Sequence, residues 1–287
     1  MGYAVFATLL IIFYSVGGFK GGPNMGIDFV GGAKITAKFS QSIDEGDVRS
    51  VLTQFDPVIQ RMGEKARNEF IITTKVVEEG IAGQGALSDV KEKLVAVYPD
   101  VEFLSEENIG PAVSGMMARA TVNLIVFAIL TMMAYLAYRF EFKYSVAAVI
   151  PLIIDVLLTL GFIIAVGIEI TVPVVAALLT VFGYSINDTI VVFDRIRENS
   201  QHQAQTTTYD MINKSVNQTL SRTILTTFST VFVILVLFFL GGEVLNPFAA
   251  VLLFGISMSV FSTLFLAAPF LYEWEKIKNR RLAKSKK

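Results

Sequence analysis

Residues 144–168 read YSVAAVIPLIIDVLLTLGFIIAVGI, an apolar stretch with a single charged residue, Asp155. A helix that crosses a bilayer needs about 20 mostly apolar residues. This stretch meets that requirement and is apolar on nearly all sides, which is typical of a helix surrounded by lipid and by other membrane helices. The sequence therefore predicts an integral membrane protein.

Four further stretches of similar character lie at residues 120–138, 170–193, 224–240 and 248–271. An earlier apolar stretch, from Tyr3 to Val16, is shorter. No basic residue precedes it and no clear small-x-small cleavage site follows it, so we interpret it as a sixth span with a missing or shortened start rather than as a secretory signal. The expected membrane part is an all-α bundle of six transmembrane helices.

The overall composition narrows the classes of function. Of the 287 residues, 53% are hydrophobic and 17% are charged, whereas soluble domains carry about 25% charged residues. The net charge of -1 excludes a globally basic nucleic-acid-binding protein, so we expect no nucleic-acid partner. The absence of cysteine and the presence of a single histidine exclude thiolate or histidine-cluster metal sites and cysteine nucleophiles. No ATP-binding loop is present either, and we expect neither an enzyme nor a metal or cofactor.

Basic residues gather in alternate connections between the apolar stretches. They are Arg139 and Lys143 in one connection, Arg195, Arg197, Lys214 and Arg222 in or beside a second, and seven Lys and Arg residues in the tail after residue 275. The two short connections on the opposite side offer Glu169 and Glu243 and no basic residue. By the positive-inside rule, both termini lie in the cytoplasm and residues 17–114 lie outside.

The external segment alternates between two hydrophobic periods. Strands are expected at residues 34–39, near 58, at 70–77 and at 101–104, and helices at 47–55 and 87–98, with Asp44 as a possible cap. This order is β-α-β-β-α-β, the split βαβ of ferredoxin-like α+β domains. The expected organisation is a first span at 1–18, an inserted ferredoxin-like domain at 19–115, five spans at 116–272 and a basic tail at 273–287.

Seven glycines lie between residues 17 and 32, and the stretch 26–32 reads GIDFVGG. A phosphate-binding loop would require a Lys-Ser/Thr pair at P-loop spacing, or G-x-G-x-x-G between a strand and a helix. Neither pattern is present. We therefore interpret this segment as a tight, glycine-dependent turn between the first span and the external sheet.

Ionisable residues within the spans are the main candidates for function. An Asp or Arg at the centre of a membrane helix costs about 2.5 to 3.5 kcal/mol. Asp188 lies in a polar cluster with Ser185, Asn187 and Thr189 inside an otherwise apolar span, and we expect it to carry protons. A cation nearby would favour its ionised form, which suggests Arg222 at the start of the next span, although this side chain could equally extend to the interface. Asp155 could equally be a structural hydrogen-bonding residue or part of transport.

Three motifs resemble one known family. They are GIDFVGG at residues 26–32, GYSINDTIVVFDRIREN at 183–199 and NQTLSRT at 217–223. Together with the order of spans and external domain, they resemble the SecF family of the bacterial SecDF protein-export complex, which belongs to the RND transporter superfamily. The long motif at 183–199 is the most specific of the three. One departure is visible, since relatives commonly have His-Asp where this chain has Ile154-Asp155.

The resemblance implies a role in a proton-driven motor of the bacterial cytoplasmic (inner) membrane. Its implied partners are SecD, as a heterodimer, the SecYEG channel, unfolded preproteins and the lipid bilayer, with protons as the coupling ion and no cofactor. It places Asp188 and Arg222 in the proton-conducting site, beside the supporting polar residues Ser185, Asn187, Thr189 and Asp155. The external-loop motif contributes Gly26, Asp28, Gly31 and Gly32.

Three other functions remain as alternatives. An RND-type proton-coupled exporter of lipids or small molecules would use the same ionisable pair. A scaffold for the export channel would tolerate loss of Asp188. An intramembrane aspartyl protease would need two facing carboxyl groups, for which Asp155 and Asp188 are the candidates.

Overall fold

The structure is a computed structural model that describes residues 24–55, 57–62, 68–75, 85–140, 142–202 and 207–285. The expected first span lies outside the described residues. The chain divides into two compact units. We call them the sheet unit, which spans Asn24–Leu124 and Glu169–Val172, and the helical unit, whose described part contains residues 125–140, 142–168, 173–202 and 207–285.

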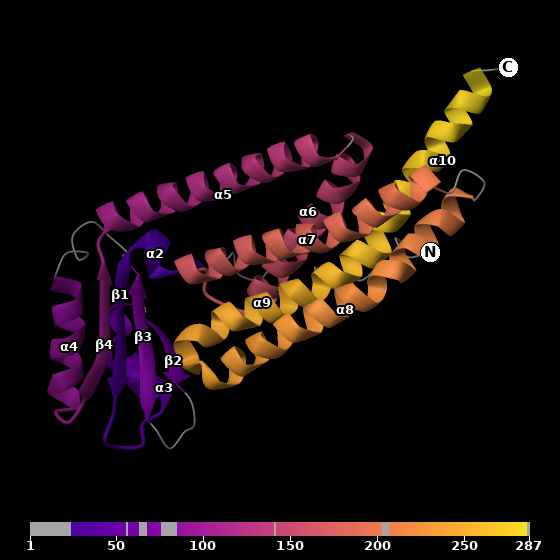
Figure 1. Ribbon diagram of the computed structural model, residues 1–287. Helices are drawn as coiled ribbons and strands as arrows, with labels where there is room; N and C mark the ends of the chain where they lie inside the picture. The colour runs from indigo at the N-terminus through magenta and orange to yellow at the C-terminus, as the bar shows by residue number, and fades with distance from the viewer. Residues whose placement is uncertain are drawn as a thin grey trace. The chain divides into compact units, whose positions relative to one another are not determined.

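The sheet unit is built on four antiparallel strands (Figure 1). The strands are β1 (Gly32–Lys38), β2 (Val58–Met62), β3 (Glu69–Lys75) and β4 (Glu102–Ile109), in the spatial order β2-β3-β1-β4. Helix α3 (Glu45–Val51), followed by a short 3-10 helix (Thr53–Phe55), connects β1 to β2, and α4 (Gly85–Val97) precedes β4. The sequence predicted this order of strands and helices.

One apolar core joins the sheet to both helices. In β1 every second residue is buried, at Ala33, Ile35 and Ala37, as the alternating pattern predicted. The sheet contributes Ile35, Phe70 and Ile72 to the core, and the helices contribute Val48, Leu52, Val90 and Leu94. Helix α3 begins after Asp44, which forms a capping box with Asp47 as the sequence suggested.

The helical unit consists of long helices joined by short connections (Figure 1). They are α5 (Pro111–Arg139), α6 (Phe142–Val166), α7 (Val172–His202), α8 (Thr208–Leu240), α9 (Gly242–Ser262), a π-helical segment η3 (Thr263–Ala267) and α10 (Ala268–Ser285). Within this unit α9 packs against both α6 and α8. Helices α5 and α7 begin in the sheet unit and continue into the helical unit.

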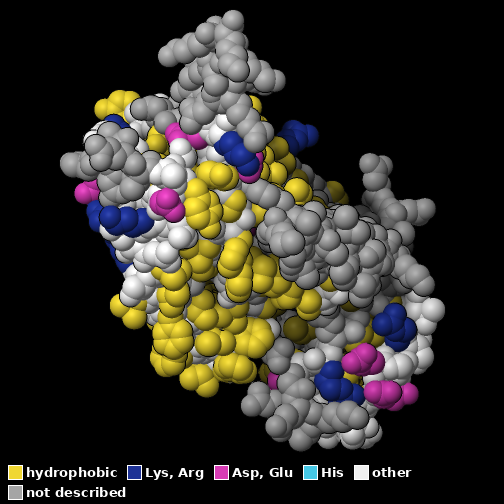
Figure 2. Space-filling model, turned by 90° about the vertical axis from the view of Figure 1, so that its right-hand side faces the viewer, with side chains coloured by type: hydrophobic (Ala, Val, Ile, Leu, Met, Phe, Trp, Pro, Cys, Tyr) yellow, Lys and Arg dark blue, Asp and Glu magenta, His cyan; other side chains and the backbone are white. Residues whose placement is uncertain are grey.

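Within the described part of the chain, five helical segments are long and apolar enough to cross a membrane: Pro111–Arg139, Tyr144–Val166, Val172–Gln201, Thr208–Leu240 and Val244–Ile277. They contain the five long apolar stretches of the sequence to within two residues at the ends of the second and third stretches. Many large apolar side chains on α5 and α8 are exposed in the isolated chain, among them Phe127, Phe232 and Phe239. Figure 2 shows a continuous area of hydrophobic side chains with few charges within it. Such a surface is typical of contact with lipid or with another membrane subunit.

Helix α8 starts well before the apolar stretch that begins at residue 224. Thr207 caps it, since its side chain accepts a hydrogen bond from the backbone N–H of Asp210. The first turns then bury Met211, Ile212 and Ser215, so tertiary packing rather than a run of apolar residues accounts for this part of the helix.

Candidate functional site

Helix α7 presents its polar cluster on one buried face. Ser185, Asp188 and Thr189 lie at positions i, i+3 and i+4, which share one side of a helix, and their exposed fractions are 1%, 3% and 1%. Asn187 belongs to the same cluster in the sequence, but its side chain is exposed. The structure therefore brings together three of the four predicted polar residues of this helix.

Asp155 of α6 meets the same face of α7. It is fully buried, and its Oδ2 atom accepts hydrogen bonds from Ser185 and, at 2.7 Å, from Ser262 of α9. Its Oδ1 atom has no hydrogen-bond partner in the described part of the chain. Asp155 is thus the acceptor that joins α6, α7 and α9, a role that the sequence left open.

Asp188 does not share the contacts of Asp155 with Ser185 and Ser262. Its carboxyl group faces α8 instead. The Thr227 hydroxyl and the Arg222 charge, both on α8, act on its carboxyl group. Its Oδ2 atom is buried without a hydrogen-bond partner among the described residues. Arg222 is exposed and lies five residues before Thr227, about 7.5 Å along the helix axis. Among the residues that the structure describes, no direct ion pair joins Arg222 to Asp188.

The two predicted carboxyl groups therefore occupy similar positions. Each lies on a long apolar helix, has a hydroxyl group of a neighbouring helix acting on it, and keeps one carboxyl oxygen without a partner in the described chain. An oxygen of this kind is where a proton can bind. Such carboxyl groups have the chemistry to take up a proton, and Arg222 is a cation whose charge acts on Asp188.

A π-helical segment adjoins these groups. Ser262 is the last residue of α9, and Thr263 is the first of η3. The Thr263 hydroxyl lies 3.2 Å from the hydroxyl of Thr189, while Ser262 contacts Asp155. Short π-helical segments occur frequently at functional sites. We did not predict these two residues, although Ser259, Ser262 and Thr263 form a polar run within an apolar span that could have indicated them.

Gly255 allows α9 to approach its neighbours closely enough for these short side chains to meet. A Cβ atom at this position would overlap the side chain of Val181 on α7 and would lie 3.1 Å from Thr159 Oγ1 on α6. Small residues commonly mark such close contacts between membrane helices.

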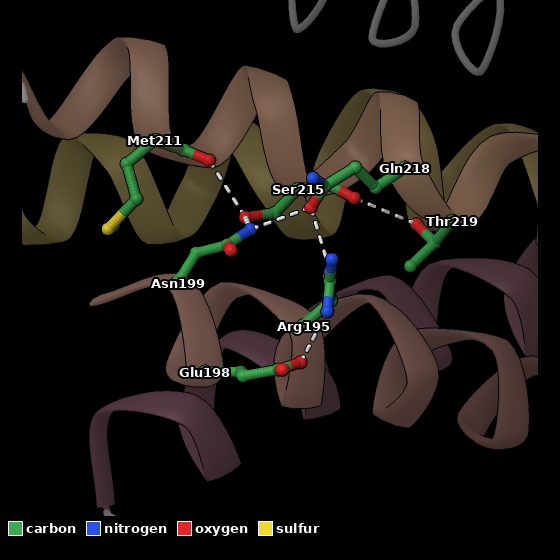
Figure 3. Close-up of polar contacts among 7 residues, drawn as sticks. All are labelled: Arg195, Glu198, Asn199, Met211, Ser215, Gln218 and Thr219. Carbon is green, nitrogen blue, oxygen red and sulfur yellow. Dashed lines mark hydrogen bonds and ion pairs between the residues drawn. The ribbon is translucent and has the colours of Figure 1, made fainter. Parts of the chain in front are cut away.

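A second polar network joins the end of α7 to the beginning of α8 (Figure 3). Arg195 donates from Nε to Gln218 Oε1 at 2.7 Å and pairs with Glu198 at 2.6 Å. Asn199 donates from Nδ2 to the same Gln218 oxygen at 2.9 Å and to the hydroxyl of Ser215 at 2.8 Å. Gln218 therefore accepts from two side chains of α7, a contact that the sequence analysis did not predict.

The same end of α7 also contacts the end of α5. Arg139 pairs with Asp194 at 3.0 Å, and both side chains are about half exposed, at 40% and 53%. Exposed pairs of this kind contribute about 0 to 1 kcal/mol. The charged residues here mainly fix the helix ends.

The external-loop motif forms a compact turn within the sheet unit. Gly26 precedes the short helix α2 (Ile27–Val30), and Gly31 and Gly32 follow with φ angles of 78° and 144°. Such angles favour glycine, as expected for a tight turn into β1. Asp28 lies within α2, and its Oδ2 atom accepts a hydrogen bond at 2.7 Å from the backbone N–H of Val172. Among the described residues, no group of three or more His, Cys, Asp or Glu side chains is placed to hold a metal ion.

Comparisons with known proteins agree with this architecture. Residues 89–277 match the family model "Protein export membrane protein SecD/SecF, C-terminal", and residues 17–43 match the "SecD/SecF GG Motif". The protein translocase subunit SecF of Desulfurispirillum indicum is 41% identical over 261 residues, which cover 88% of this chain and 82% of that protein. SecF of Endomicrobium trichonymphae is 37% identical over 95% of this chain and 89% of its own length.

A solved structure has the same fold. The crystal structure of SecDF, a translocon-associated membrane protein from Thermus thermophilus, matches 95% of this chain with a TM-score of 0.79 and 31% identity. The chain spans 37% of the length of that larger protein. The extent of these matches, along both this chain and its relatives, is sufficient to assign the family. The chain belongs to the SecF family of protein translocase subunits.

Proposed function

We propose that this chain acts in protein export as the SecF half of a proton-driven motor. The relatives that match along most of their length are translocase subunits, and in the SecDF protein of Thermus thermophilus a region similar to this chain is part of one longer protein. That fusion supports a heterodimer with a separate SecD subunit. SecYEG and unfolded preproteins are the further partners, and protons are the coupling ion, with no other cofactor and no catalytic reaction.

The proposed fold adds two features to the observed one. Residues 1–18 supply a sixth span, and the sheet unit is a ferredoxin-like domain on the outer side of the bacterial inner membrane. The order β2-β3-β1-β4 and the β-α-β-β-α-β connectivity support the ferredoxin-like assignment. The basic connections and tail support a cytoplasmic position for both termini.

The observation that carries the proposal is the buried carboxyl group of Asp188, which is 3% exposed on an apolar helix beside Thr227 and Arg222 of α8. Ionised Asp188 attracts the Arg222 guanidinium, and protonation removes that attraction. One proton that crosses a potential of 100 mV releases about 2.3 kcal/mol, which is enough to shift two helix arrangements of similar energy. Uptake and release of a proton at Asp188 would thus alter the contact between α7 and α8.

The test is proton-driven export by the assembled SecD–SecF complex in membrane vesicles. Asp188→Asn keeps the shape of the side chain but cannot take up a proton, so we expect loss of the export that depends on the proton gradient. Asp194→Asn is the matched control, because Asp194 lies on the same helix but is half exposed and pairs with Arg139. Full gradient-dependent export by Asp188→Asn would contradict the motor and favour the scaffold.

The exporter and protease alternatives have less support. The proteins that match along most of their length are named as translocase subunits, and no observation favours a lipid or small-molecule substrate. Asp155 and Asp188 also have different partners, since one binds Ser185 and Ser262 and the other contacts α8.

A further inference from the structure

The external-loop motif contacts the connection that leads into α7. The backbone N–H of Gly26 donates to the carbonyl of Ile170 at 2.8 Å, and the N–H of Ile170 donates to the carbonyl of Asn24 at 2.7 Å. A Cβ atom on Gly26 would lie 2.9 Å from both the Ile170 carbonyl oxygen and Thr171 Cγ2. Glycine at this position therefore allows the two backbones to lie in direct contact.

Asp28 extends this contact to the helix itself. Its Oδ2 atom accepts from the backbone N–H of Val172, the first residue of α7, at 2.7 Å. The first N–H groups of a helix have no partner within the helix, and the next residue, Pro173, has no N–H group to satisfy. A carboxylate is also favoured near the positive end of the helix dipole. Asp28 thus stabilises the start of α7 from a position 144 residues away in the sequence.

The segment that carries Asp28 is firmly attached to the sheet. Only Gly31 separates α2 from β1, and β1 is an inner strand that pairs with both β3 and β4. On the other side of the contact, α7 continues without interruption from Val172 to His202. Asp188 therefore lies about 24 Å along the same helix from the residue that Asp28 contacts.

We propose that Asp28 is a positioning residue that ties β1, an inner strand of the external sheet, to the first turn of α7. Displacement of the sheet unit then moves α7 as a rod and changes the position of Asp188 relative to α8, and the reverse coupling follows by reciprocity. This inference rests on the proposed role of Asp188 in proton transfer.

Spin-label distances in the SecD–SecF complex can test the tie directly. The chain contains no native cysteine, so cysteines introduced at the exposed positions Glu102 in β4 and Gln201 in α7 can be labelled without background. The measurement is the change in their distance distribution when a proton gradient is imposed on reconstituted vesicles. We expect the change to be lost in Asp28→Ala and retained in Asp28→Asn, because an asparagine side chain also accepts a hydrogen bond at a helix start.

Asp47→Ala is the matched control. The Oδ2 atom of Asp47 accepts a hydrogen bond at 3.2 Å from the backbone N–H of Asp44, at the start of α3. Loss of the Asp47 carboxylate therefore removes a helix cap in the sheet unit without affecting α7. Hydrogen exchange provides a second readout: the first-turn amides of α7 should exchange about fivefold faster in Asp28→Ala and at the original rate in Asp47→Ala. If Asp28→Ala does not accumulate, Gly26→Ala should reduce the distance change, because its methyl group pushes Ile170 away.

The outcomes separate the inference from the proposed function. A full distance change in Asp28→Ala, with none in Asp188→Asn, overturns the tie and leaves the proton role of Asp188 intact. A full distance change in Asp188→Asn overturns the proton role and the inference with it. Loss of the change in both variants, with a normal response in Asp47→Ala, supports the tie.

Discussion

Gln218 offers a quantitative test of the link between α7 and α8. Its Oε1 atom accepts from Arg195 Nε at 2.7 Å and from Asn199 Nδ2 at 2.9 Å (Figure 3). Gln218 lies four residues before Arg222, and Arg195 and Asn199 lie seven and eleven residues after Asp188, so both contacts lie within about three helical turns of the proposed proton pair. Replacing Gln218 by Ala removes one acceptor and leaves two donors without it.

The expected loss of stability follows from the burial of the two donors. The Arg195 side chain is 35% exposed, so water replaces the lost acceptor and the cost is about 0.5 to 1 kcal/mol. Asn199 is 7% exposed, and a buried donor that loses its acceptor costs about 1 to 3 kcal/mol. The sum is about 1.5 to 4 kcal/mol. At about 2 to 3 °C per kcal/mol for a chain of this size, the apparent Tm should fall by about 3 to 12 °C.

The assay is thermal unfolding of the purified complex in lipid nanodiscs, followed by proton-driven export in vesicles. Gln218→Glu keeps the acceptor and adds a negative charge beside Arg195, so its Tm should stay within about 2 °C of the unmodified protein. Asn217→Ala changes an exposed amide next to Gln218 and is the matched control. Export should fall severalfold in Gln218→Ala and stay unchanged in Gln218→Glu and Asn217→Ala. The reason is that only Gln218→Ala removes the contacts that hold α7 and α8 in position against each other.

A Tm for Gln218→Ala within about 1 °C of the unmodified protein would refute the acceptor role, since the buried donor alone costs at least that much. A double-mutant cycle between Arg195 and Gln218 provides a second criterion. If the two side chains interact as drawn, Arg195→Ala should cost about 1 kcal/mol less in the Gln218→Ala background than in the unmodified protein.

Two further predictions concern packing and pH. Gly255→Ala should lower the stability of the helical unit by about 1 to 3 kcal/mol in thermal unfolding, because the added methyl group overlaps the Val181 side chain; Gly183→Ala, where nothing lies within 4 Å, is the control and should not destabilise. Burial raises the pKa of Tyr98 above its ordinary value, and the charge of Asp47 adds to this effect. Folding favours the neutral phenol of Tyr98 over the ionised form. Its contribution to the free energy of unfolding is therefore intact below about pH 10 and is lost as the pH rises further. The decline in stability above pH 10 should thus be smaller in Tyr98→Phe than in the unmodified protein.

The sequence predicted most secondary structure because its hydrophobic periods are clear. The alternation at residues 34–39 predicted β1, and the five long apolar stretches predicted five membrane-compatible helices. The early start of α8 at Thr208 was not predicted, since its first turns are polar and are held by burial of Met211 and Ile212 against the rest of the helical unit. The local sequence cannot predict this part of α8, because packing against other helices rather than its own composition stabilises it.

The sequence indicated the two buried carboxyl groups and Arg222 but not most of their hydroxyl partners. An acid inside an apolar span is conspicuous in any sequence, and Asp188 and Asp155 were both found in this way. Their partners on other helices depend on packing, so Ser262, Thr263 and Thr227 were missed. The contact of Asp28 with Val172 spans 144 residues and has no local signal. Asn187 was included because it adjoins Asp188, although neighbouring residues on a helix face different directions.

The π-helical segment has a consequence for how related sequences should be compared. Each π-turn contains one more residue per hydrogen bond than an α-turn, so the angular phase of the side chains changes between α9 and α10. Ser262 and Thr263 are adjacent in the sequence, yet Ser262 hydrogen-bonds to Asp155 on α6 and Thr263 to Thr189 on α7. A single-residue deletion within 263–267 should restore an uninterrupted α-helix and leave the later side chains on their present faces, because the π-turn accommodates one extra residue. An alignment that treats the last span as one continuous helix would assign its lipid-facing and buried positions incorrectly from this point onward.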